Sequence, residues 1–499
     1  GLSDDSMQAS DWLSWWTGST RAATKSSCAR PGRAMKEDAR AHACTLLFDQ
    51  GTLVLEFQDA SMRPYAPSGF VPDPRIGGRL RAPAIHYRRA LAQLIRSGLS
   101  VDDQARGYSA IPLPAPRQRT PYPHQAKAMD AWRKGGKRGV IVLPTGAGKS
   151  YIAEMAIFEV QRSTLVVAPT IDLMMQWINL LGEVFGEDMV GGVGGGLYEV
   201  KPLTATTYDS AYIHVEHLGK RFGLLVFDEC HHLPGASYAG SAEGSIAPFR
   251  LGLSATPERP DGSHERLEHL IGPTLYRQDI KDLAGLYLAD YEVVRIEVNL
   301  TESERERYDH ERALYRDFVS SEGIRVSSPG GWGHFIQASC RSERGRRAWR
   351  GWREQRRISL QSEAKLERLS DILKEHAEEQ IIIFTADNDT VYAISRRHLI
   401  PALTHQTPGV ERKEVLAQFN AGKLRAVVTS KVLNEGVDMP AASVGVVLSG
   451  SGSVREHVQR LGRILRRGEG KQAVLYEVIT RGTGEEGLSE RRRDHGAYQ

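Results

Sequence analysis

The stretch Val140-Ile-Val-Leu-Pro-Thr-Gly-Ala-Gly-Lys-Ser150 joins an apolar run to a glycine-rich turn. Residues 140–143 are apolar at every position, which is typical of a strand covered on both faces in a parallel sheet. A strand, a glycine-rich loop and the start of a helix, in this order, direct backbone N–H groups toward a phosphate group. We therefore predict that Lys149 contacts the β- and γ-phosphates of a nucleotide and that Ser150 holds Mg²⁺. Leu143 stands where the general phosphate-loop pattern has its first glycine, and the alternative is a chance Gly-Lys-Ser turn.

An acidic pair follows a second run of this kind. Short runs that are apolar on both faces alternate with helical patterns and lie at residues 165–167, 224–227 and 251–253. Asp228 and Glu229 come directly after the middle run. We expect Asp228 to bind Mg²⁺ through water and Glu229 to polarise the attacking water. His231 and His232 resemble a metal pair, but adjacent side chains on an extended segment point to opposite faces, so joint binding of zinc is not expected.

Two arginines near the C-terminus are candidates for the same reaction. Gln459-Arg-Leu-Gly-Arg-Ile-Leu-Arg466 places Arg463 and Arg466 three positions apart, on one face of a helix. Such arginines can reach across a cleft and stabilise charge on a leaving γ-phosphate. The alternative is a solvated basic helix. Ser254-Ala-Thr256 could link the hydrolysis site to a second lobe, although an ordinary strand-to-loop turn explains that triplet when it is taken alone.

Composition limits the class of protein. A chain of 499 residues predicts about three domains. With 40% hydrophobic and 25% charged residues it is not collagen-like, a coiled coil or wholly disordered. The net charge of +4 does not itself indicate nucleic acid, and the excess of 50 arginines over 15 lysines fits either phosphate contacts or a GC-rich genome. Four scattered cysteines and the lack of a long apolar run predict a cytoplasmic protein without a membrane span.

The order of patterns along the chain predicts its organisation. Residues 1–40 form a mostly disordered tail. In the α+β module that follows, strands at 45–48 and 52–57 flank the turn Asp49-Gln50-Gly51, and a helix covers 84–96. Pro112, Pro114 and Pro116 form a stiff linker.

A second series of apolar runs begins near residue 380, and charged helical sequence separates the two series. The runs of the second series lie at residues 381–384, 426–428, 444–448 and 474–478. We therefore predict an α/β protein with two parallel-sheet lobes, an N-terminal α+β module and a helical insertion between the lobes. The expected parts are a tail at 1–40, the module at 41–115, lobe 1 at 116–294, the insertion at 295–360, lobe 2 at 361–485 and a tail at 486–499.

Two further segments have unusual composition. Residues 341–357 contain eight arginines and two glutamates, with tryptophans interleaved. Arginines on phosphates and tryptophans against bases predict DNA contact, whereas the alternative is a solvated helix face with the tryptophans packed inward. The expected contact residues are Arg346, Arg347, Trp349, Arg350, Trp352 and Arg353. Gly191-Gly-Val-Gly-Gly-Gly196 lacks a leading strand and a following helix, which predicts a flexible surface loop and no dinucleotide site.

Together these segments resemble the motifs of superfamily 2 helicases, in the order found there. The matching segments are residues 144–150, Ala168-Pro-Thr170 with Gln176, residues 228–231, Ser254-Ala-Thr256, Asn434-Glu-Gly-Val-Asp438 and residues 459–466. The resemblance is closer still to the XPB family, especially its archaeal and bacterial members. It rests on Thr206-Thr-Tyr-Asp-Ser-Ala211, Ser449-Gly-Ser-Gly-Ser453 and residues 459–466, and runs from about residue 45 to about residue 485.

The resemblance implies a fold and a function. It implies two RecA-like lobes, a DNA damage-recognition-like module and a thumb-like helical insertion. The implied activity is that of an ATP-dependent 3′→5′ DNA translocase or helicase that acts in nucleotide excision repair. The implied cofactors are ATP and Mg²⁺, and the implied partners are DNA and a nuclease. The resemblance also implies a prokaryotic, nucleoid-associated protein. Lys149, Asp228, Glu229, Arg463 and Arg466 would be catalytic. The nucleotide-binding residues would be Gln125, Pro144, Thr145, Gly146, Ala147, Gly148, Lys149, Ser150, Gly436, Asp438 and Gln459.

Two other functions stay open, and one position departs from the family. An RNA helicase would carry the same lobe motifs, and a DNA-binding scaffold that recruits a nuclease would barely hydrolyse ATP. XPB proteins have an Arg-Glu-Asp triplet tied to strand separation, where this chain reads Arg259-Pro260-Asp261. Proline removes a carboxylate and a backbone N–H, so we expect weak unwinding without a partner. The alternative is that Glu258 takes the place of the missing glutamate.

Overall fold

The computed structural model describes residues 43–75, 77–114, 119–259, 261–283, 290–326, 328, 330–430, 442–448 and 472–487. The chain forms two compact units, one of Gly1–Val142 with Lys149–Arg277 and one of Leu143–Gly148 with Gln278–Gln499. Several predicted features lie outside the described residues, namely the tail at 1–40, Pro260, Gly436, Asp438, Gln459, Arg463 and Arg466.

The N-terminal module is a five-stranded sheet with strand order β3-β4-β2-β1-β5. Its elements are β1 (Cys44–Asp49), β2 (Thr52–Phe57), η1 (Ala60–Tyr65), β3 (Val71–Pro72), β4 (Leu80–Pro83), η2 (Ala84–His86), α2 (Tyr87–Arg96) and β5 (Val101–Asp103). β1 and β2 pair antiparallel around the predicted turn, where Gln50 and Gly51 have φ of 48° and 81°. Two successive left-handed residues give the turn twist that a two-residue hairpin requires.

The first unit also contains an eight-stranded sheet with order β13-β6-β12-β11-β7-β10-β8-β9. Every pair is parallel except β8 with β9. The strands are β6 (Arg138–Val142), β7 (Thr164–Ala168), β8 (Val190–Gly194), β9 (Leu197–Glu199), β10 (Leu203–Thr207), β11 (Leu224–Asp228), β12 (Phe249–Ser254) and β13 (Thr274–Arg277). All four predicted apolar runs are strands of this sheet.

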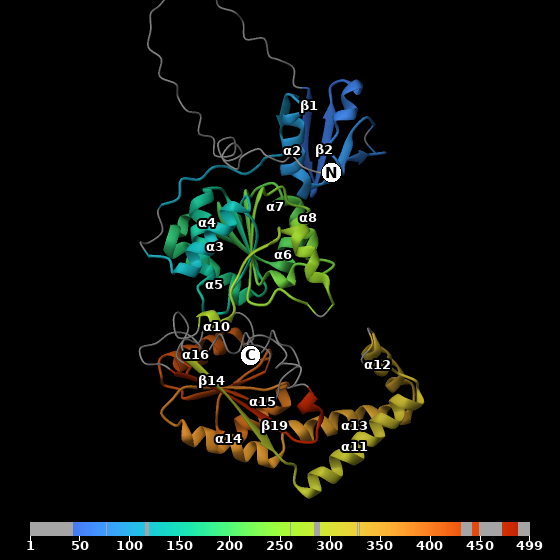
Figure 1. Ribbon diagram of the computed structural model, residues 1–499, viewed down its shortest axis with the longest axis vertical. Coiled ribbons are helices and arrows are strands. Elements are labelled where there is room, and N and C mark those ends of the chain that lie inside the picture. The colour runs from blue at the N-terminus through green and yellow to red at the C-terminus, as the bar shows by residue number, and fades with distance from the viewer. Residues whose placement is uncertain are drawn as a thin grey trace, which may run out of the picture. The chain divides into compact units, whose positions relative to one another are not determined.

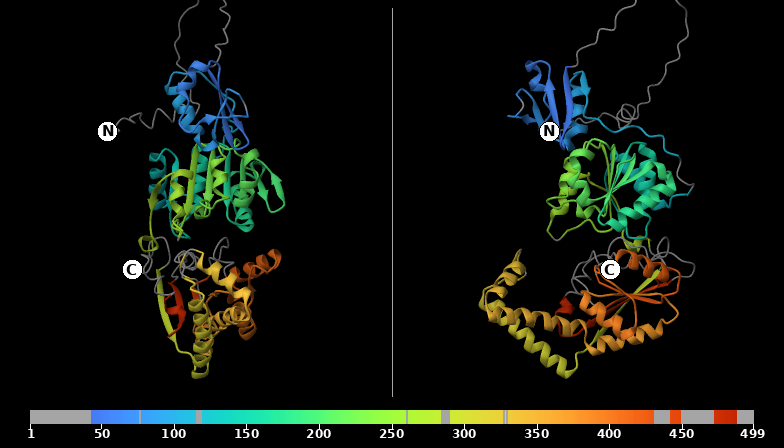
Figure 2. Two further views of the ribbon diagram at one scale, coloured as in Figure 1. Left: turned by 90° about the vertical axis from the view of Figure 1, so that its right-hand side faces the viewer. Right: turned by 180° about the vertical axis from the view of Figure 1, so that it is seen from behind.

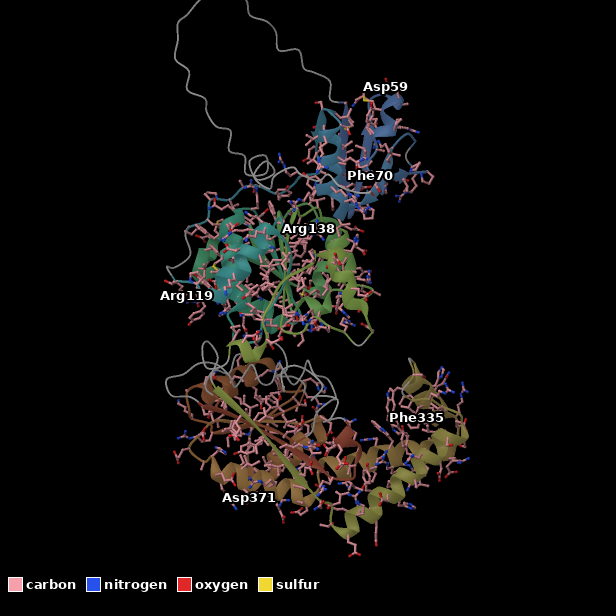
Figure 3. All side chains as sticks on the ribbon, viewed as in Figure 1. Asp59, Phe70, Arg119, Arg138, Phe335 and Asp371 are labelled. Carbon is pink, nitrogen blue, oxygen red and sulfur yellow. The ribbon has the colours of Figure 1, made fainter. Side chains whose placement is uncertain are left out.

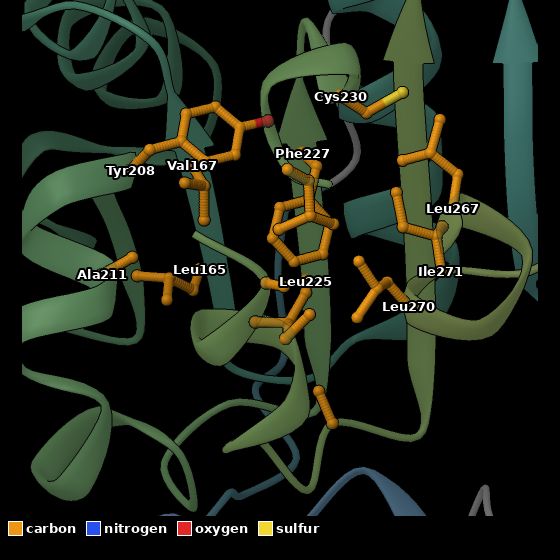
Figure 4. Packing of buried hydrophobic residues seen from close by; sticks show 14 of the residues in the cluster. Leu165, Val167, Tyr208, Ala211, Leu225, Phe227, Cys230, Leu267, Leu270 and Ile271 are labelled. Carbon is orange, nitrogen blue, oxygen red and sulfur yellow. The ribbon is translucent and has the colours of Figure 1, made fainter. Parts of the chain in front are cut away.

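Helices cover both faces of this sheet, as Figure 1 shows. α3, α4 and α5 lie on one face and α6, α7 and α8 on the other. Their bounds, with the small helices that follow, are α3 (Pro123–Lys134), α4 (Lys149–Val160), α5 (Ile171–Phe185), η3 (Glu187–Met189), α6 (Tyr208–Ile213), α7 (Val215–Leu218), η4 (Cys230–His232), α8 (Ala239–Glu243), η5 (Ser263–Glu265) and α9 (Arg266–Leu270). The core between layers includes Leu165, Val167, Leu225, Phe227 and Ile271 (Figure 4).

The prediction of a surface loop at residues 191–196 is wrong for residues 191–194, which lie in β8, whereas Gly195 and Gly196 form an exposed turn. Gly191, Gly192 and Val193 are buried within β8, which pairs with β10 and β9. A Cβ at Gly191 would lie 2.2 Å from the carbonyl oxygen of Glu199, so the neighbouring strand can approach only a glycine. Gly191 therefore permits the backbones of two neighbouring strands to pack closely in the sheet.

The described part of the proline linker, residues 110–114, lies on lobe 1 as a strap. Ile111 and Leu113 are buried, and the Ile111 N–H donates to the carbonyl oxygen of Gln161 at 3.1 Å. Ala110 forms an isolated bridge with Arg162. The segment therefore contributes apolar burial to the lobe that it precedes.

The second unit is built on a six-stranded parallel sheet with order β14-β19-β18-β15-β17-β16. Its elements are α10 (Ile280–Leu283), β14 (Asp290–Val298), α14 (Glu363–Glu375), β15 (Ile381–Phe384), α15 (Asn388–His398), β16 (Ala402–Leu403), α16 (Gly409–Asn420), β17 (Ala426–Thr429), β18 (Val444–Val447) and β19 (Gln472–Thr480). The four predicted runs of the second series all fall on these strands. β14 and β16 at the two edges were not predicted.

Three helices separate β14 from the rest of this sheet. They are α11 (Glu302–Ser321), α12 (Gly331–Arg341) and α13 (Glu343–Leu360). Figures 1 and 2 show α11 and α13 side by side, with α12 at their far end. Phe335 of α12, labelled in Figure 3, is fully buried with Phe318 and Ala348 in a separate small core. The charged sequence thus folds as a helical insertion with apolar packing of its own.

Candidate active site

The glycine-rich loop joins β6 to α4. Gly146 and Gly148 have φ of +88° and +81°, a region that L side chains rarely adopt, so both positions require glycine. The Ala147 N–H donates to the carbonyl oxygen of Pro144 at 3.2 Å, which closes the turn. α4 begins at Lys149, and Ser150 lies in its first turn. The N-terminus of α4 therefore follows the turn directly, as phosphate binding requires.

Asp228 ends β11 with its carboxylate buried. The Trp177 indole N–H donates to its Oδ2 at 2.9 Å, and the Glu229 backbone N–H donates to its Oδ1 at 3.1 Å. Burial, and next the charge of Glu229, raise the pKa of Asp228 to about 6, whereas the bond from Trp177 and the charge of Lys149 lower it. The structure therefore brings Lys149 of the loop and Asp228 of the acidic pair within electrostatic range of each other.

Glu229 has a strained backbone. Its φ and ψ are 46° and 54°, in the left-handed region. A non-glycine residue there costs roughly 1–3 kcal/mol and requires support from its surroundings. Tyr208 supplies support, since its hydroxyl donates to the carbonyl oxygen of Asp228 at 2.9 Å. This left-handed residue turns the chain sharply at the end of β11, directly after Asp228.

Ser254 of the Ser-Ala-Thr triplet contacts the acidic segment. Its hydroxyl lies 3.2 Å from Nδ1 of His231 and 3.5 Å from Oε2 of Glu229. The Thr256 N–H donates to the same hydroxyl at 3.2 Å. The triplet is therefore connected to the hydrolysis residues by side-chain hydrogen bonds within lobe 1.

The geometric argument about the two histidines was wrong in its premise. His231 and His232 lie on a 3₁₀ turn, η4, and not on an extended segment. Their ring centroids are 4.3 Å apart. Among the described residues no group of three or more His, Cys, Asp or Glu side chains is arranged to hold a metal ion.

Gln125 is buried at the start of α3. Its side-chain Oε1 accepts the backbone N–H of Tyr122 at 2.9 Å and completes a capping box. Tyr122 is 48% exposed, and its ring stacks on His124 with an interplanar angle of 17°. The contact of Gln125 with adenine stays a prediction.

The oxygen donors fit Mg²⁺. This ion keeps several waters and takes few protein ligands beside the phosphate oxygens of a nucleotide. Asp228 and Ser150 supply one carboxylate and one hydroxyl. The Thr145 hydroxyl of the same loop is buried without a hydrogen-bond partner, as is that of Thr256. These groups suit a hard cation and its phosphate ligands, with Mg²⁺ neutralising charge on the phosphates.

The tryptophans of α13 face inward, which corrects the prediction that they contact bases. Trp349 and Trp352 pack on the Phe318–Phe335 cluster and stack on each other, with centroids 5.2 Å apart. The ring centroid of Trp332, in α12, lies 4.7 Å from that of Trp352. Each tryptophan ring is packed against other aromatic rings, so Trp349 and Trp352 are part of the small apolar core of the helical insertion.

The arginines of α13 differ in their partners. Arg347 forms a two-pronged ion pair with Glu311 of α11, at 2.6 and 2.7 Å, and so braces the helical pair. Arg346 and Arg350 are exposed, and neither has an ion pair within the part of the chain that the structure describes. Arg353 is also exposed and lies 3.7 Å from Asp389. Arg350, Arg353 and Arg356 line a groove of about 730 Å³.

Comparison with known proteins agrees with this geometry. Three families match successive parts of the chain. They are the damage recognition domain of xeroderma pigmentosum group B helicases at residues 46–105, the res subunit of type III restriction enzymes at 118–259 and the helicase conserved C-terminal domain at 364–468. The helicase domain of Pyrococcus furiosus Hef aligns with a TM-score of 0.51 at 18% identity, over 74% of this chain and 97% of that one. That likeness concerns the fold.

Two relatives are similar in sequence. The DNA 3′-5′ translocase XPB2 of Sulfurisphaera tokodaii is 41% identical over 412 residues, which cover 82% of this chain and 93% of that protein. The DNA 3′-5′ helicase XPB of Kineococcus radiotolerans is 30% identical over 76% of this chain and 63% of that protein.

The two parallel α/β sheets, the phosphate loop and the acidic pair define an enzyme of the superfamily 2 helicase class, with RecA-like lobes. Within that class, the match to the damage recognition domain and the identity to XPB2 settle the family. The chain belongs to the XPB family, as its motifs predicted.

Trp177 and Tyr208 were missed by sequence reasoning. Both contact the Asp228–Glu229 segment, from helices on opposite faces of the sheet. Tyr208 lies within a segment quoted for the family resemblance, which was the one available signal. Trp177 follows Gln176 and gave none.

Proposed function

We propose that this protein is an ATP-dependent DNA translocase that moves 3′→5′ and acts in DNA repair, in nucleotide excision. The observation that carries the proposal is the combination in one chain of a phosphate loop between β6 and α4, an acidic pair with a buried Asp228 at the end of β11, and a damage-recognition-type module. The names of the relatives, a DNA 3′-5′ translocase and a DNA 3′-5′ helicase, support the polarity and the choice of DNA.

The residues of lobe 1 have distinct roles in this proposal. The loop at 144–150 cradles the phosphates, Lys149 binds the β- and γ-phosphates, and Ser150 and Asp228 hold Mg²⁺. Gln125 binds the adenine. Glu229 polarises the water that attacks the γ-phosphate. The two carboxylates belong to successive residues, and the chain turns through the left-handed backbone of Glu229 directly after Asp228.

Lobe 2 completes the site in this proposal. Arg463 and Arg466 stabilise the charge on the leaving phosphate, and Gly436, Asp438 and Gln459 bind the nucleotide; all five lie outside the described residues. Catalysis of this kind depends on positioning and on charge stabilisation, so closure of the lobes is required for turnover. DNA that favours the closed state would then stimulate hydrolysis.

The DNA contacts are proposed on the outer face of α13. Arg346, Arg350 and Arg353 are exposed there, and they are the predicted contacts whose guanidinium groups are least engaged within the protein. The expected boundary at residue 294 needs correction, because β14 (Asp290–Val298) pairs with β19 in the sheet of lobe 2. The functional parts proposed are a damage-recognition module at 41–115, lobe 1 at 116–277, a thumb-like insertion at 299–360 and lobe 2 at 278–298 and 361–485, between tails at 1–40 and 486–499.

The surroundings proposed for the protein follow from its family. We place it in the cytoplasm of a prokaryote, associated with the nucleoid, with DNA and a nuclease as partners. No helix within the described ranges is long and apolar enough to cross a bilayer.

A comparison of ATPase stimulation by DNA and by RNA of equal length tests the proposal. DNA should stimulate hydrolysis, and streptavidin should be displaced from the biotinylated 5′ end of single-stranded DNA faster than from the 3′ end, which reports 3′→5′ movement without duplex unwinding. Equal stimulation by RNA would favour an RNA helicase. A rate that DNA does not change would favour a scaffold.

The variant Lys149→Ala tests the assignment of the nucleotide site. It removes the cation on the β- and γ-phosphates, so ATP turnover should be lost while DNA binding without nucleotide persists. Lys134→Ala is the control, because Lys134 is an exposed lysine on α3 of the same lobe. Hydrolysis by Lys149→Ala at the rate of the control would overturn the assignment.

A further inference from the structure

We propose that Trp177 is a positioning residue that fixes the Asp228 carboxylate in the orientation that receives Mg²⁺. The inference rests on the metal-binding role proposed for Asp228. Trp177 is 3% exposed on α5, and its indole N–H donates to Asp228 Oδ2 at 2.9 Å. The two residues are 51 positions apart in the sequence, so the bond ties the end of β11 to a separate helix.

The Trp177 bond fixes the orientation of the Asp228 carboxylate, which the backbone next to Asp228 does not fix. A buried carboxylate needs hydrogen-bond donors to remain ionised. Oδ1 receives the N–H of the next residue, Glu229, and that donor moves with the same strained turn. Oδ2 receives a donor from another element. The Trp177 bond therefore sets the rotation of the carboxylate relative to the rest of lobe 1.

The donor is itself held firmly. α5 begins at a capped turn, where the Thr170 hydroxyl accepts the Leu173 N–H at 3.2 Å. Met174 and Leu181, one turn to either side of Trp177, are fully buried with it. An indole has only two side-chain torsions and presents one N–H, so packing of its ring fixes the direction of the donor.

The consequence concerns Mg²⁺ and not the nucleotide as a whole. Groups that hydrogen-bond a metal-ligating side chain orient it, and their loss typically costs 10–100-fold in metal affinity. Trp177 contacts the metal-site carboxylate, whereas the phosphate loop is built from residues 143–150. Loss of the indole N–H should weaken Mg²⁺-dependent nucleotide binding and leave Mg²⁺-free nucleotide binding intact.

The variant Trp177→Phe tests this inference, because it keeps an aromatic ring and removes the N–H. Binding of a fluorescent ADP analogue is measured with and without Mg²⁺, and ATPase is measured against Mg²⁺ concentration. The Mg²⁺ concentration at half effect should rise about 10–100-fold. The affinity for ADP without Mg²⁺, and DNA binding, should stay at the wild-type value.

Trp132→Phe is the matched control. Trp132 is fully buried in the same lobe, and its indole N–H donates to the carbonyl oxygen of Arg250 at 3.0 Å. Both variants lose one buried hydrogen bond and should lose thermal stability, but only Trp177→Phe should change the Mg²⁺ dependence. An equal change in both variants, or in neither, would overturn the inference.

Two further measurements separate the outcomes. Asp228→Asn should also shift the Mg²⁺ dependence; if it does not, the role proposed for Asp228 fails. If Asp228→Asn shifts it and Trp177→Phe does not, the inference about Trp177 alone fails. Should Trp177→Phe not fold, ¹⁵N-labelled indole groups of the wild-type protein report instead. The Trp177 resonance should move with Mg²⁺ and ADP together, more than with ADP alone, and an unmoved resonance would contradict the inference.

Discussion

Asp228 and Glu229 lower the stability of the unliganded lobe. Burial and the neighbouring charge of Glu229 raise the pKa of Asp228 to about 6, which means that its ionised form is disfavoured in the folded protein. Glu229 adds the strain of a left-handed backbone. Both features fit the metal site proposed above, because a bound divalent cation would compensate for the two charges.

The variant Asp228→Asn should therefore be more stable than the wild type when Mg²⁺ and nucleotide are absent. The folded pKa lies above the unfolded value of 3.8, so the wild type bears the full penalty above pH 6 and is relieved of it as the pH falls toward 4. The gain at pH 8 should be about 1–3 kcal/mol. Unfolding of both proteins, measured between pH 8 and pH 5, checks the size and the pH dependence.

Asp188→Asn is the control for that experiment, because Asp188 is an exposed aspartate of the same lobe. Its stability should follow that of the wild type at every pH. If Asp228→Asn gains the same free energy of unfolding at every pH, the stabilisation comes from altered packing or hydrogen bonding and not from removal of the charge of Asp228.

At this scale the sequence predicts residues better than it predicts their contacts. The loop glycines and the acidic pair have fixed spacings to their strands, so they could be assigned in advance. The bond between Trp177 and Asp228 could not, because it depends on how α5 packs over the sheet. No pattern in the sequence indicates which of eight tryptophans donates to a carboxylate.

At the scale of single elements, α13 has two functions on two faces. Its inner face contributes Trp349 and Trp352 to an aromatic core, and its outer face presents arginines. The tryptophans hold the helix against α11 and α12, which keeps the outer arginines in a fixed row. The excess of arginine over glutamate in this helix is therefore compatible with stable packing, because the arginines and the tryptophans lie on different faces.

Replacing Arg346, Arg350 and Arg353 by Gln should weaken DNA binding and flatten its dependence on salt. Each lost phosphate contact should lower the log–log slope by about 0.9 on duplex DNA. Titrations at several salt concentrations check this. Arg396→Gln, on the exposed end of α15, is the control for charge alone. An unchanged slope in the triple variant would mean that this face is only solvated.

The strands show why some elements escape prediction. β7, β11 and β15 are continuous apolar runs and could be read directly. β8 is rich in glycine, which has a low preference for strands, and it pairs because only glycine admits the backbone of Glu199. β14 is a half-buried edge strand that pairs over its full length with β19, nearly two hundred positions away, and its alternating polar residues do not form the continuous apolar run that indicated the other strands.

At the scale of the first unit as a whole, Arg88 joins the N-terminal module to lobe 1. Its guanidinium donates to the carbonyl oxygens of Gly136 at 2.9 Å and Pro248 at 3.2 Å, and it lies 5.9 Å from the ring centroid of Phe249. Ile85 of the module is part of the core cluster of lobe 1. The module is therefore attached by specific contacts as well as by the strap at residues 110–114.

Arg88→Met should loosen this attachment while both parts stay folded. Two hydrogen bonds from a charged donor are lost, and the carbonyl groups lose their partner, which should cost about 1–3 kcal/mol. Hydrogen exchange in α2 and at Gly136 should become faster. Arg89→Met is the control, since Arg89 is the exposed neighbour on the same helix. Equal exchange in the two variants would contradict a docking role for Arg88.

The triplet Arg259-Pro260-Asp261 departs from the Arg-Glu-Asp pattern named for the family above. Arg259 is held by Asp261, at 2.9 Å, and by the carbonyl oxygen of His231, at 3.0 Å. Glu258, the residue that could replace the family's glutamate, forms an ion pair with Arg277. Its carboxylate thus already has a partner within lobe 1.

Pro260→Glu should therefore raise strand displacement at constant ATPase. The substitution restores a carboxylate and a backbone N–H next to Arg259, whose link to the carbonyl oxygen of His231 connects it to the hydrolysis segment. The ATP site keeps its own residues, so translocation without unwinding should persist in the wild type. Pro260→Ala separates the two effects of proline, because it restores the N–H alone. Equal unwinding by the wild type and Pro260→Glu would contradict the prediction, because it would show that a glutamate at position 260 does not promote strand separation in this protein.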